Sequence, residues 1–175
     1  MPYSPDDFKR VMRRWTVGVA IVTTRLADAV HGLTASGFVG VSLDPPLVTV
    51  SIGHDQHSHA WIKNSGCFAV NFLRADQRDL SDLFAGRLSE AVDRFAGVTY
   101  RSEVSGAPIF DKCLAWFDCR VVAAHVVGDH TLFVGEILAG DVVGDAAPLV
   151  YYDGDYRRLL REEAATPSLI RSVSS

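Results

Sequence analysis

The chain begins with apolar residues at helical spacing and then changes to β-branched runs. The first pattern follows a Ser4-Pro5 start and an acidic turn, and it predicts a helix over residues 4–14. The second pattern predicts many strands with few helices between them. The expected strands cover residues 17–24, 32–38, 47–52, 67–73, 114–127, 131–143 and 148–152. The further expected helices cover residues 58–64, 76–85 and about 89–95.

The two longest strands define the fold class. Within residues 114–127, apolar residues alternate with Asp118 and Arg120, and this period of two predicts a half-buried antiparallel strand. Gly128-Asp129-His130 then has the composition of a hairpin turn. A parallel α/β sheet needs a helix after nearly every strand, and these strands lack one. We therefore expect a mainly β protein, an antiparallel closed barrel with peripheral helices.

Composition narrows the class of protein. With 175 residues, we expect one domain over residues 1–160 and a polar C-terminal tail over 161–175. The net charge of −4, with Lys and Arg scattered, favours neither nucleic acid nor an anionic membrane as partner. Three cysteines without tight spacing indicate a reducing compartment. The N-terminus lacks the pattern of a signal peptide and no apolar run has membrane-spanning length, so we expect a cytoplasmic protein.

Residues 32–48 carry the most informative polar pattern. They place hydroxyls and glycines between two apolar runs and end in a Pro pair. A loop of this composition presents backbone N–H groups and short hydroxyls, for which a phosphate is a natural ligand. On composition alone, a polar strand end followed by a turn of small residues is the more common arrangement.

Two other kinds of site find little support. No Gly-x-Gly-x-x-Gly follows a strand, and no Walker-type phosphate loop occurs, so Rossmann and P-loop sites are not expected. Histidines at 54, 57 and 59 lie close together, but no Cys or carboxylate pair has matching spacing nearby. A solvated His-rich turn explains them better than a metal, and no metal site is expected.

Taken in order, several segments resemble the short-chain flavin reductase family, the reductase components of two-component flavin-dependent monooxygenases. The resemblance spans about residues 8–159 and implies an FMN-binding split β-barrel with Greek-key antiparallel strands. The segments that carry it are Thr34 to Pro46, Ser58-His59, Asn71-Phe72-Leu73, Phe84-Ala85-Gly86-Arg87, Gly128-Asp129-His130 with Gly135-Glu136, and Pro148 to Leu159.

The resemblance also implies ligands and site residues. The flavin, FMN or FAD, would lie along residues 34–37, with its phosphate at the start of the helix near Ser58. His130 would stand beside the flavin ring where the nicotinamide of NADH or NADPH stacks, and is the implied catalytic residue. The implied cofactor-binding residues are Thr34, Ala35, Ser36, Gly37, Ser51, Ile52, Gly53, His57, Ser58, His59, Phe84, Ala85, Gly86, Arg87 and Tyr156.

The implied activity is that of an NAD(P)H-dependent flavin reductase. A hydride would pass from nicotinamide C4 to flavin N5, a step that needs stacked rings rather than acid–base residues. Reduced flavin would then serve a separate monooxygenase, and the family resemblance implies a homodimer. Two alternatives remain open: a non-catalytic flavin-binding split-barrel protein, and an oxidase of the pyridoxamine-phosphate type. The latter would need a basic pocket, and the sequence has no clear Arg/Lys cluster.

Overall fold

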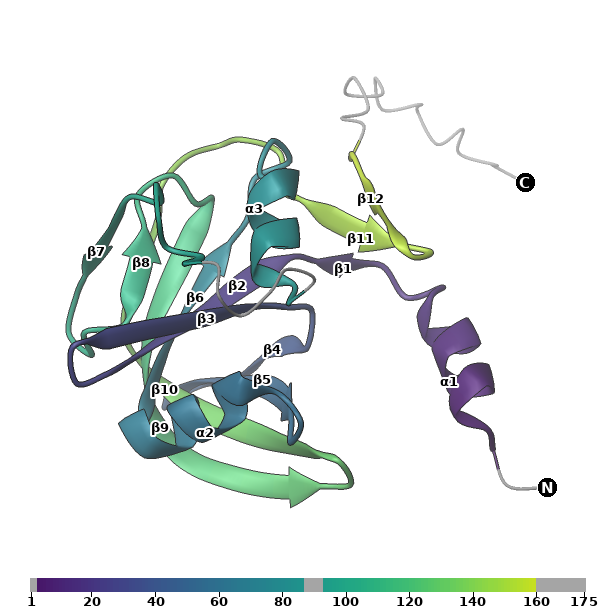
Figure 1. Ribbon diagram of the computed structural model, residues 1–175, viewed down its shortest axis with the longest axis horizontal. Helices are drawn as coiled ribbons and strands as arrows, with labels where there is room; N and C mark the ends of the chain where they lie inside the picture. Colours follow the sequence, from purple (N-terminus) through teal and green to yellow (C-terminus); the bar gives the residue numbers. More distant parts are fainter. Residues whose placement is uncertain (1–2, 87–92, 160–175) are drawn as a thin grey trace, which may run out of the picture.

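The computed structural model describes residues 3–86 and 93–159, and it is mainly β (Figure 1). Its main sheet has seven antiparallel strands in the order β3-β2-β6-β9-β10-β5-β4. This confirms the predicted fold class. The strands of this sheet are β2 Ala20–Leu26, β3 Ala29–Ala35, β4 Phe38–Leu43, β5 Pro46–Gly53, β6 Cys67–Phe72, β9 Ala115–Val127 and β10 His130–Val142.

The sheet is not closed, which corrects the closed barrel expected from the sequence. Strands β3 and β4 are consecutive in the chain, yet they lie at opposite ends of the strand order. Within the described residues, no backbone pairing joins the two. Only Ser36 and Gly37 connect them, so this short link lies where the barrel is split.

The remaining strands form two small sheets, in which the sequence predicted only the strands at residues 17–18 and 150–152. One contains β1 Val17–Gly18, β11 Val150–Tyr152 and β12 Asp155–Arg157, and the other pairs β7 Tyr100–Ser102 with β8 Pro108–Phe110. The expected strand over residues 17–24 is divided between β1 and β2 at Val19. Strands of two or three residues have too few positions to establish a period of two.

Three helices accompany the strands: α1 Pro5–Met12, α2 His57–Ser65 and α3 Arg78–Phe84. All three were predicted, with small differences at their ends. Ser4 caps α1, accepting a hydrogen bond from the Asp7 amide at 3.0 Å. Gly66 ends α2 in the left-handed conformation, with φ 69°. The fourth expected helix, about 89–95, lies mostly outside the described residues, as does the expected tail over 161–175.

Two clusters of buried residues share the sheet. Neighbours along a strand enter different clusters, because successive side chains point to opposite faces: Ile21 belongs to one cluster and Val22 to the other. Close packing also requires a glycine at position 135, where a Cβ would lie 2.5 Å from Phe68 Cζ. This packing fixes β5, β10 and β3, the strands that carry the candidate site.

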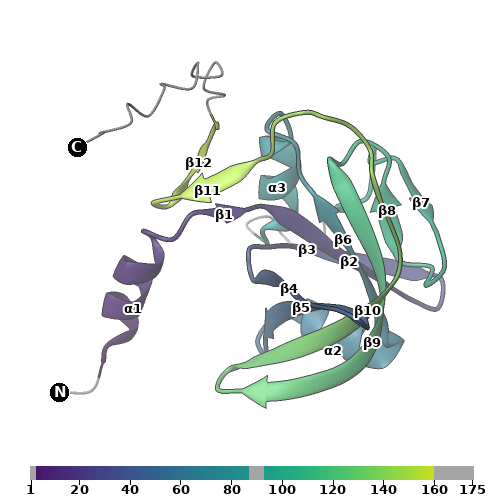
Figure 2. The same cartoon turned by 180° about the vertical axis from the view of Figure 1, so that it is seen from behind.

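Helix α1 stands apart from the sheet, as Figures 1 and 2 both show. None of its residues is buried. The apolar face predicted from its spacing is therefore exposed in the single chain. The exposed positions are Phe8, Val11, Met12 and, just beyond the helix, Trp15. Over residues 3–86 and 93–159, no helix combines the length and apolarity needed to cross a membrane.

Candidate functional site

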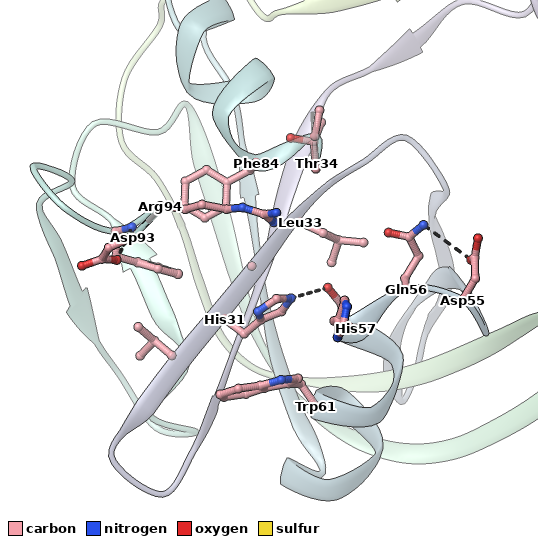
Figure 3. A pocket seen from close by; sticks show the side chains of 16 residues that line it. His31, Leu33, Thr34, Asp55, Gln56, His57, Trp61, Phe84, Asp93 and Arg94 are labelled. Atoms are coloured by element: carbon pink, nitrogen blue, oxygen red, sulfur yellow. Dashed lines mark hydrogen bonds between the residues drawn. The ribbon is translucent and has the colours of Figure 1, made fainter. Parts of the chain in front are cut away.

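A cavity of about 410 Å³ lies between β3, the start of α2 and the end of α3 (Figure 3). Its volume falls within the range typical of ligand pockets, roughly 300–1,000 Å³. In Figure 1, β3 runs between α3 and α2, and both helices contact it. Six of the residues predicted from the sequence line the cavity, namely Thr34, His57, Ser58, Phe84, Ala85 and Gly86.

Ser58 is held in place by a residue that the sequence did not single out. The Ser58 side chain is buried, and its Oγ lies 2.8 Å from His31 Nε2. The His31 ring in turn stacks on Trp61, with ring centroids 5.2 Å apart and planes at 22°. We call this stacked pair, His31 and Trp61, the aromatic shelf. Burial lowers the pKa of His31, and the positive charges of Arg94 and His57 lower it further.

Thr34 connects the cavity to α3 and β12. Its hydroxyl donates to the backbone carbonyl of Ser81 at 2.6 Å. The hydroxyl of Tyr156 lies 2.8 Å from Ser81 Oγ and 3.0 Å from Asp82 Oδ1. Tyr156 therefore contacts Thr34 only through Ser81, and it does not itself line the cavity.

Beyond Thr34, a second part of the candidate site consists of small residues and main chain. We call the row Ser36, Gly37, Ser51, Gly53 and His130 the backbone strip. The Ser51 amide donates to the Gly37 carbonyl at 2.9 Å, and His130 pairs with Gly53 across β10 and β5. A Cβ at Gly37 would lie 3.2 Å from Ser51 Cβ, so a larger residue would crowd this strip.

Two predicted residues beside the strip contribute only main chain. The side chains of Ala35 and Ile52 belong to the core, with exposed fractions of 8% and 1%. Their side chains cannot touch a ligand in this arrangement. Residues 38–43, which the sequence suggested as part of an anion-binding loop, instead form strand β4. The loop is thus reduced to Ser36 and Gly37.

His130 stands at the exposed end of the strip. It begins β10 rather than lying within the hairpin turn, and its Nδ1 is 2.7 Å from Asp129 Oδ1. The contact lowers the pKa of Asp129, and a carboxylate only accepts, so Nδ1 carries the proton. The Nε2 atom lies on the Gly53 side, 3.6 Å from where a Cβ of that residue would be.

His59 points away from the cavity and toward the sheet. Its Nε2 lies 2.8 Å from Thr131 Oγ1, and His54 Nε2 lies 3.1 Å from the same hydroxyl. Burial lowers the pKa of His59, helped by the nearby charges of His54 and Lys63. The three neighbouring histidines therefore divide: His57 lines the cavity, while His54 and His59 fasten the start of α2 to β10. Across residues 3–86 and 93–159, no three His, Cys, Asp or Glu side chains converge as a metal site requires.

The start of α2 fits an anionic group. Gln56 is its N-cap and makes no side-chain capping hydrogen bond. The N-cap side chain thus does not compete with a ligand for this end of the helix, and the helix dipole favours a negative charge there. Ser58, expected near the helix start, is its second residue and bonds His31 instead. Arg87, the other residue expected near a phosphate, lies outside the described residues.

The cavity-lining residues that sequence reasoning missed include His31, Trp61 and Arg94. A weak signal existed for Trp61, which follows His57 by four residues and so shares its helix face. His31 and Arg94 carry no such signal. Their position depends on how β3 and residues 93–95 meet, which is a tertiary contact.

Comparison with known proteins identifies the family. A sequence profile described as "Flavin reductase like domain" matches residues 12–160. The chain belongs to this flavin reductase-like family.

Individual relatives are similar along nearly their whole length. The chain is 40% identical over 161 residues to a protein named NADH-dependent flavin reductase from a Rhodococcus species, covering 89% of this chain and 87% of the relative. It is 34% identical over 166 residues to the reductase subunit HsaB of a flavin-dependent monooxygenase from Mycobacterium tuberculosis, covering 94% and 87%. The solved structure of flavin reductase PheA2 superposes with a TM-score of 0.83 at 39% identity, covering 91% of this chain and all of that one.

Proposed function

We propose that this chain is an NAD(P)H-dependent flavin reductase that transfers a hydride from reduced nicotinamide to FMN or FAD. The observation that carries the proposal is the joining of a cavity at an uncapped helix start to a strip of glycines and main chain ending in His130. The proposal is supported by the family membership and by the activity for which the Rhodococcus relative is named.

The residues present suit a flavin. The backbone strip consists of small residues that leave room beside a ring system, and the start of α2 favours a phosphate. When bound, flavin and nicotinamide supply the hydride acceptor and donor, so the protein needs no acid–base pair of its own. Its task is to align two rings and exclude water.

His130 is the residue we assign to nicotinamide positioning. Its side chain is 46% exposed, while Asp129 fixes the ring orientation through Nδ1. An exposed yet oriented imidazole beside Gly53 can contact a second ring that arrives from solvent. This assignment extends the role implied by the family resemblance.

The decisive experiment measures flavin reduction and flavin release together. Purified protein is mixed with NADH or NADPH and increasing flavin under anaerobic conditions, and loss of the flavin's visible absorbance is followed. A saturable dependence of rate on added flavin supports a reductase that releases its product. A flavin that binds without being reduced would instead identify a non-catalytic flavin-binding protein.

We further propose that the reduced flavin serves a partner monooxygenase. The support is that the M. tuberculosis relative is named as the reductase subunit of a flavin-dependent monooxygenase. A monooxygenase supplied with this protein and NADH should hydroxylate its substrate. If hydroxylation requires a different reductase under the same conditions, the assignment of that partner is wrong.

We also propose that the chain forms a homodimer through the exposed apolar surface of α1. Phe8, Val11 and Trp15 are 58%, 54% and 68% exposed, which is unusual for large apolar side chains on one short segment. Val11→Glu should raise the dimer dissociation constant at least tenfold, roughly 1.4 kcal/mol, because it buries a charge in an apolar interface. Sedimentation velocity measures this, and Lys9→Glu on the same helix is the control; an unchanged dimer in Val11→Glu would exclude this surface.

A cytoplasmic location completes the proposal. Cys67, Cys113 and Cys119 are unpaired and buried, which suits a reducing compartment. Burial raises the pKa of Cys113 to about 11 and that of Cys119 to about 12, so neither is a reactive thiolate at neutral pH.

A further inference from the structure

Strand β12 is joined to helix α3 by one side chain. Tyr156 lies in the middle of β12, and its hydroxyl is 2.8 Å from Ser81 Oγ and 3.0 Å from Asp82 Oδ1. A carboxylate only accepts hydrogen bonds, so Tyr156 donates its single hydroxyl hydrogen to Asp82. The hydroxyl of Ser81, a residue with no exposed surface, then donates to Tyr156. The buried Ser81 side chain is thus fixed on β12.

The main-chain carbonyl of Ser81 is bonded in the opposite direction, to Thr34. In a regular α-helix this carbonyl accepts a hydrogen bond from the amide four residues later. At the end of α3 that amide, of Ala85, donates to the carbonyl of Asp82 at 3.3 Å. The Ser81 carbonyl accepts from the Thr34 hydroxyl at 2.6 Å. Ser81 therefore joins Tyr156 through its side chain and Thr34 through its main chain.

The bond to Ser81 determines what Thr34 can offer to a ligand. A threonine hydroxyl has one hydrogen and two lone pairs. Because the hydrogen is directed to Ser81, only the oxygen lone pairs remain for a ligand in the cavity that Thr34 lines. Figure 3 shows the Thr34 side chain beside α3, as this bond requires. Thr34 is therefore an oriented acceptor, which suits the hydroxyl donors of the flavin side chain.

Tyr156 is itself held from several sides. The guanidinium carbon of Arg78 lies 5.0 Å from the centroid of its ring, and Tyr151 meets the ring edge-on with centroids 5.5 Å apart. The hairpin of β11 and β12 is anchored to the core by Leu149, whose amide donates to the carbonyl of Leu73 at 2.8 Å. The Tyr156 hydroxyl is thus a fixed point to which α3 is attached.

We propose that Tyr156 is a positioning residue for flavin binding: through Ser81 it sets the orientation of the Thr34 hydroxyl. The inference rests on the proposed function, and it gives a role to a residue that does not line the cavity. Tyr156 then supports the flavin without touching it. Since FMN and FAD share the side chain that Thr34 would contact, the effect is the same for both.

The test is a double-mutant cycle on flavin affinity, measured by fluorescence titration with FMN and with FAD. Tyr156→Phe removes the hydroxyl and keeps the ring contacts with Arg78 and Tyr151. It should weaken both flavins about fivefold, and Thr34→Val, which removes the acceptor itself, should weaken them about tenfold. The double variant should bind within about twofold of Thr34→Val, because Tyr156 acts through Thr34.

Further variants separate positioning from a general loss of stability. Ser81→Ala breaks the same link from the α3 side and should reproduce the fivefold loss. Tyr151→Phe removes a hydroxyl from the residue paired with Tyr156 and should leave both flavins within about twofold. Tyr156→Phe should also raise the KM for flavin about fivefold and leave the KM for NADH within about twofold, a split that general destabilisation would not produce.

Three results would overturn the inference. The first is unchanged flavin affinity in Tyr156→Phe or in Ser81→Ala, and the second is unchanged flavin affinity in Thr34→Val. The third is a double variant in which the two separate losses multiply, since Tyr156 would then act by a route that bypasses Thr34. All three can occur in a chain that reduces flavin. Failure of the proposed function looks different and would overturn both: the wild-type chain would then reduce neither flavin.

Discussion

The two ends of the candidate site differ in the protein groups that form them. The backbone strip consists of small residues and main chain, with one large side chain, the exposed His130, at its edge. The cavity is instead walled by large side chains whose positions are fixed by contacts between elements, as in the stack of Trp61 on His31. We propose that the strip holds the isoalloxazine ring that FMN and FAD share, and that the cavity holds the phosphate attached to it.

Within the strip, flavin binding can be separated from the use of the nicotinamide. Changes to its small residues should affect FMN and FAD alike, because both carry the same ring. Changes at His130 should lower kcat/KM for NADH and leave the affinity for both flavins nearly unchanged.

The largest effect is expected at Gly37. A valine there would bring a branched side chain within 3.2 Å of Ser51 Cβ and over the strip. We expect both flavins to bind about a hundredfold more weakly, a loss of roughly 2.7 kcal/mol, by fluorescence titration. Gly40→Val is the matched control, since a Cβ at Gly40 meets nothing within 4 Å. Normal flavin binding by a folded Gly37→Val protein would show that the strip is not the ring site.

The next effect concerns His130. Replacing it with alanine should lower kcat/KM for NADH about tenfold, roughly 1.4 kcal/mol of transition-state stabilisation, because the nicotinamide loses an oriented contact. The dissociation constant of the flavin should change less than about threefold. His125→Ala, an exposed histidine elsewhere on the hairpin, serves as control. Equal losses for flavin and nicotinamide would indicate that His130 supports the strip structurally.

The smallest effect concerns pH. The fold lowers the pKa of His31 below its ordinary value of 6.5, so the unfolded chain takes up the proton first as the solution becomes acidic. This histidine's contribution to stability is therefore complete above about pH 6.5 and is lost as the pH falls below that value. His31→Gln should make the melting temperature fall less steeply between about pH 7.5 and 5.5. A steeper fall in the variant would contradict the direction of the shift.

The sequence predicted the long elements well. The alternation in residues 114–127 and the apolar spacing in residues 4–14 are local signals, and both elements, β9 and α1, appear where expected. Strand β4 was missed because its glycine and serine resembled a loop, and its exposed Val39, Val41 and Leu43 depend on pairing with β5.

The gap between the barrel edges could not have been predicted from the sequence. Whether β3 and β4 pair depends on the path of seven strands rather than on any local pattern. The same holds for the shelf, since His31 and Trp61 come from a strand and a helix separated by the whole of β4 and β5. The residues of the backbone strip could be named from the order of the sequence segments. The residues of the cavity wall come together only through tertiary packing.

The central claim is that strip and cavity together hold a flavin for reduction by a nicotinamide. Anaerobic stopped-flow mixing of the protein with NADH and increasing FAD tests it most directly. The account predicts a saturable loss of the flavin's visible absorbance, with catalytic amounts of protein reducing an excess of flavin. Quenched flavin fluorescence without any loss of visible absorbance, with either NADH or NADPH, would contradict it.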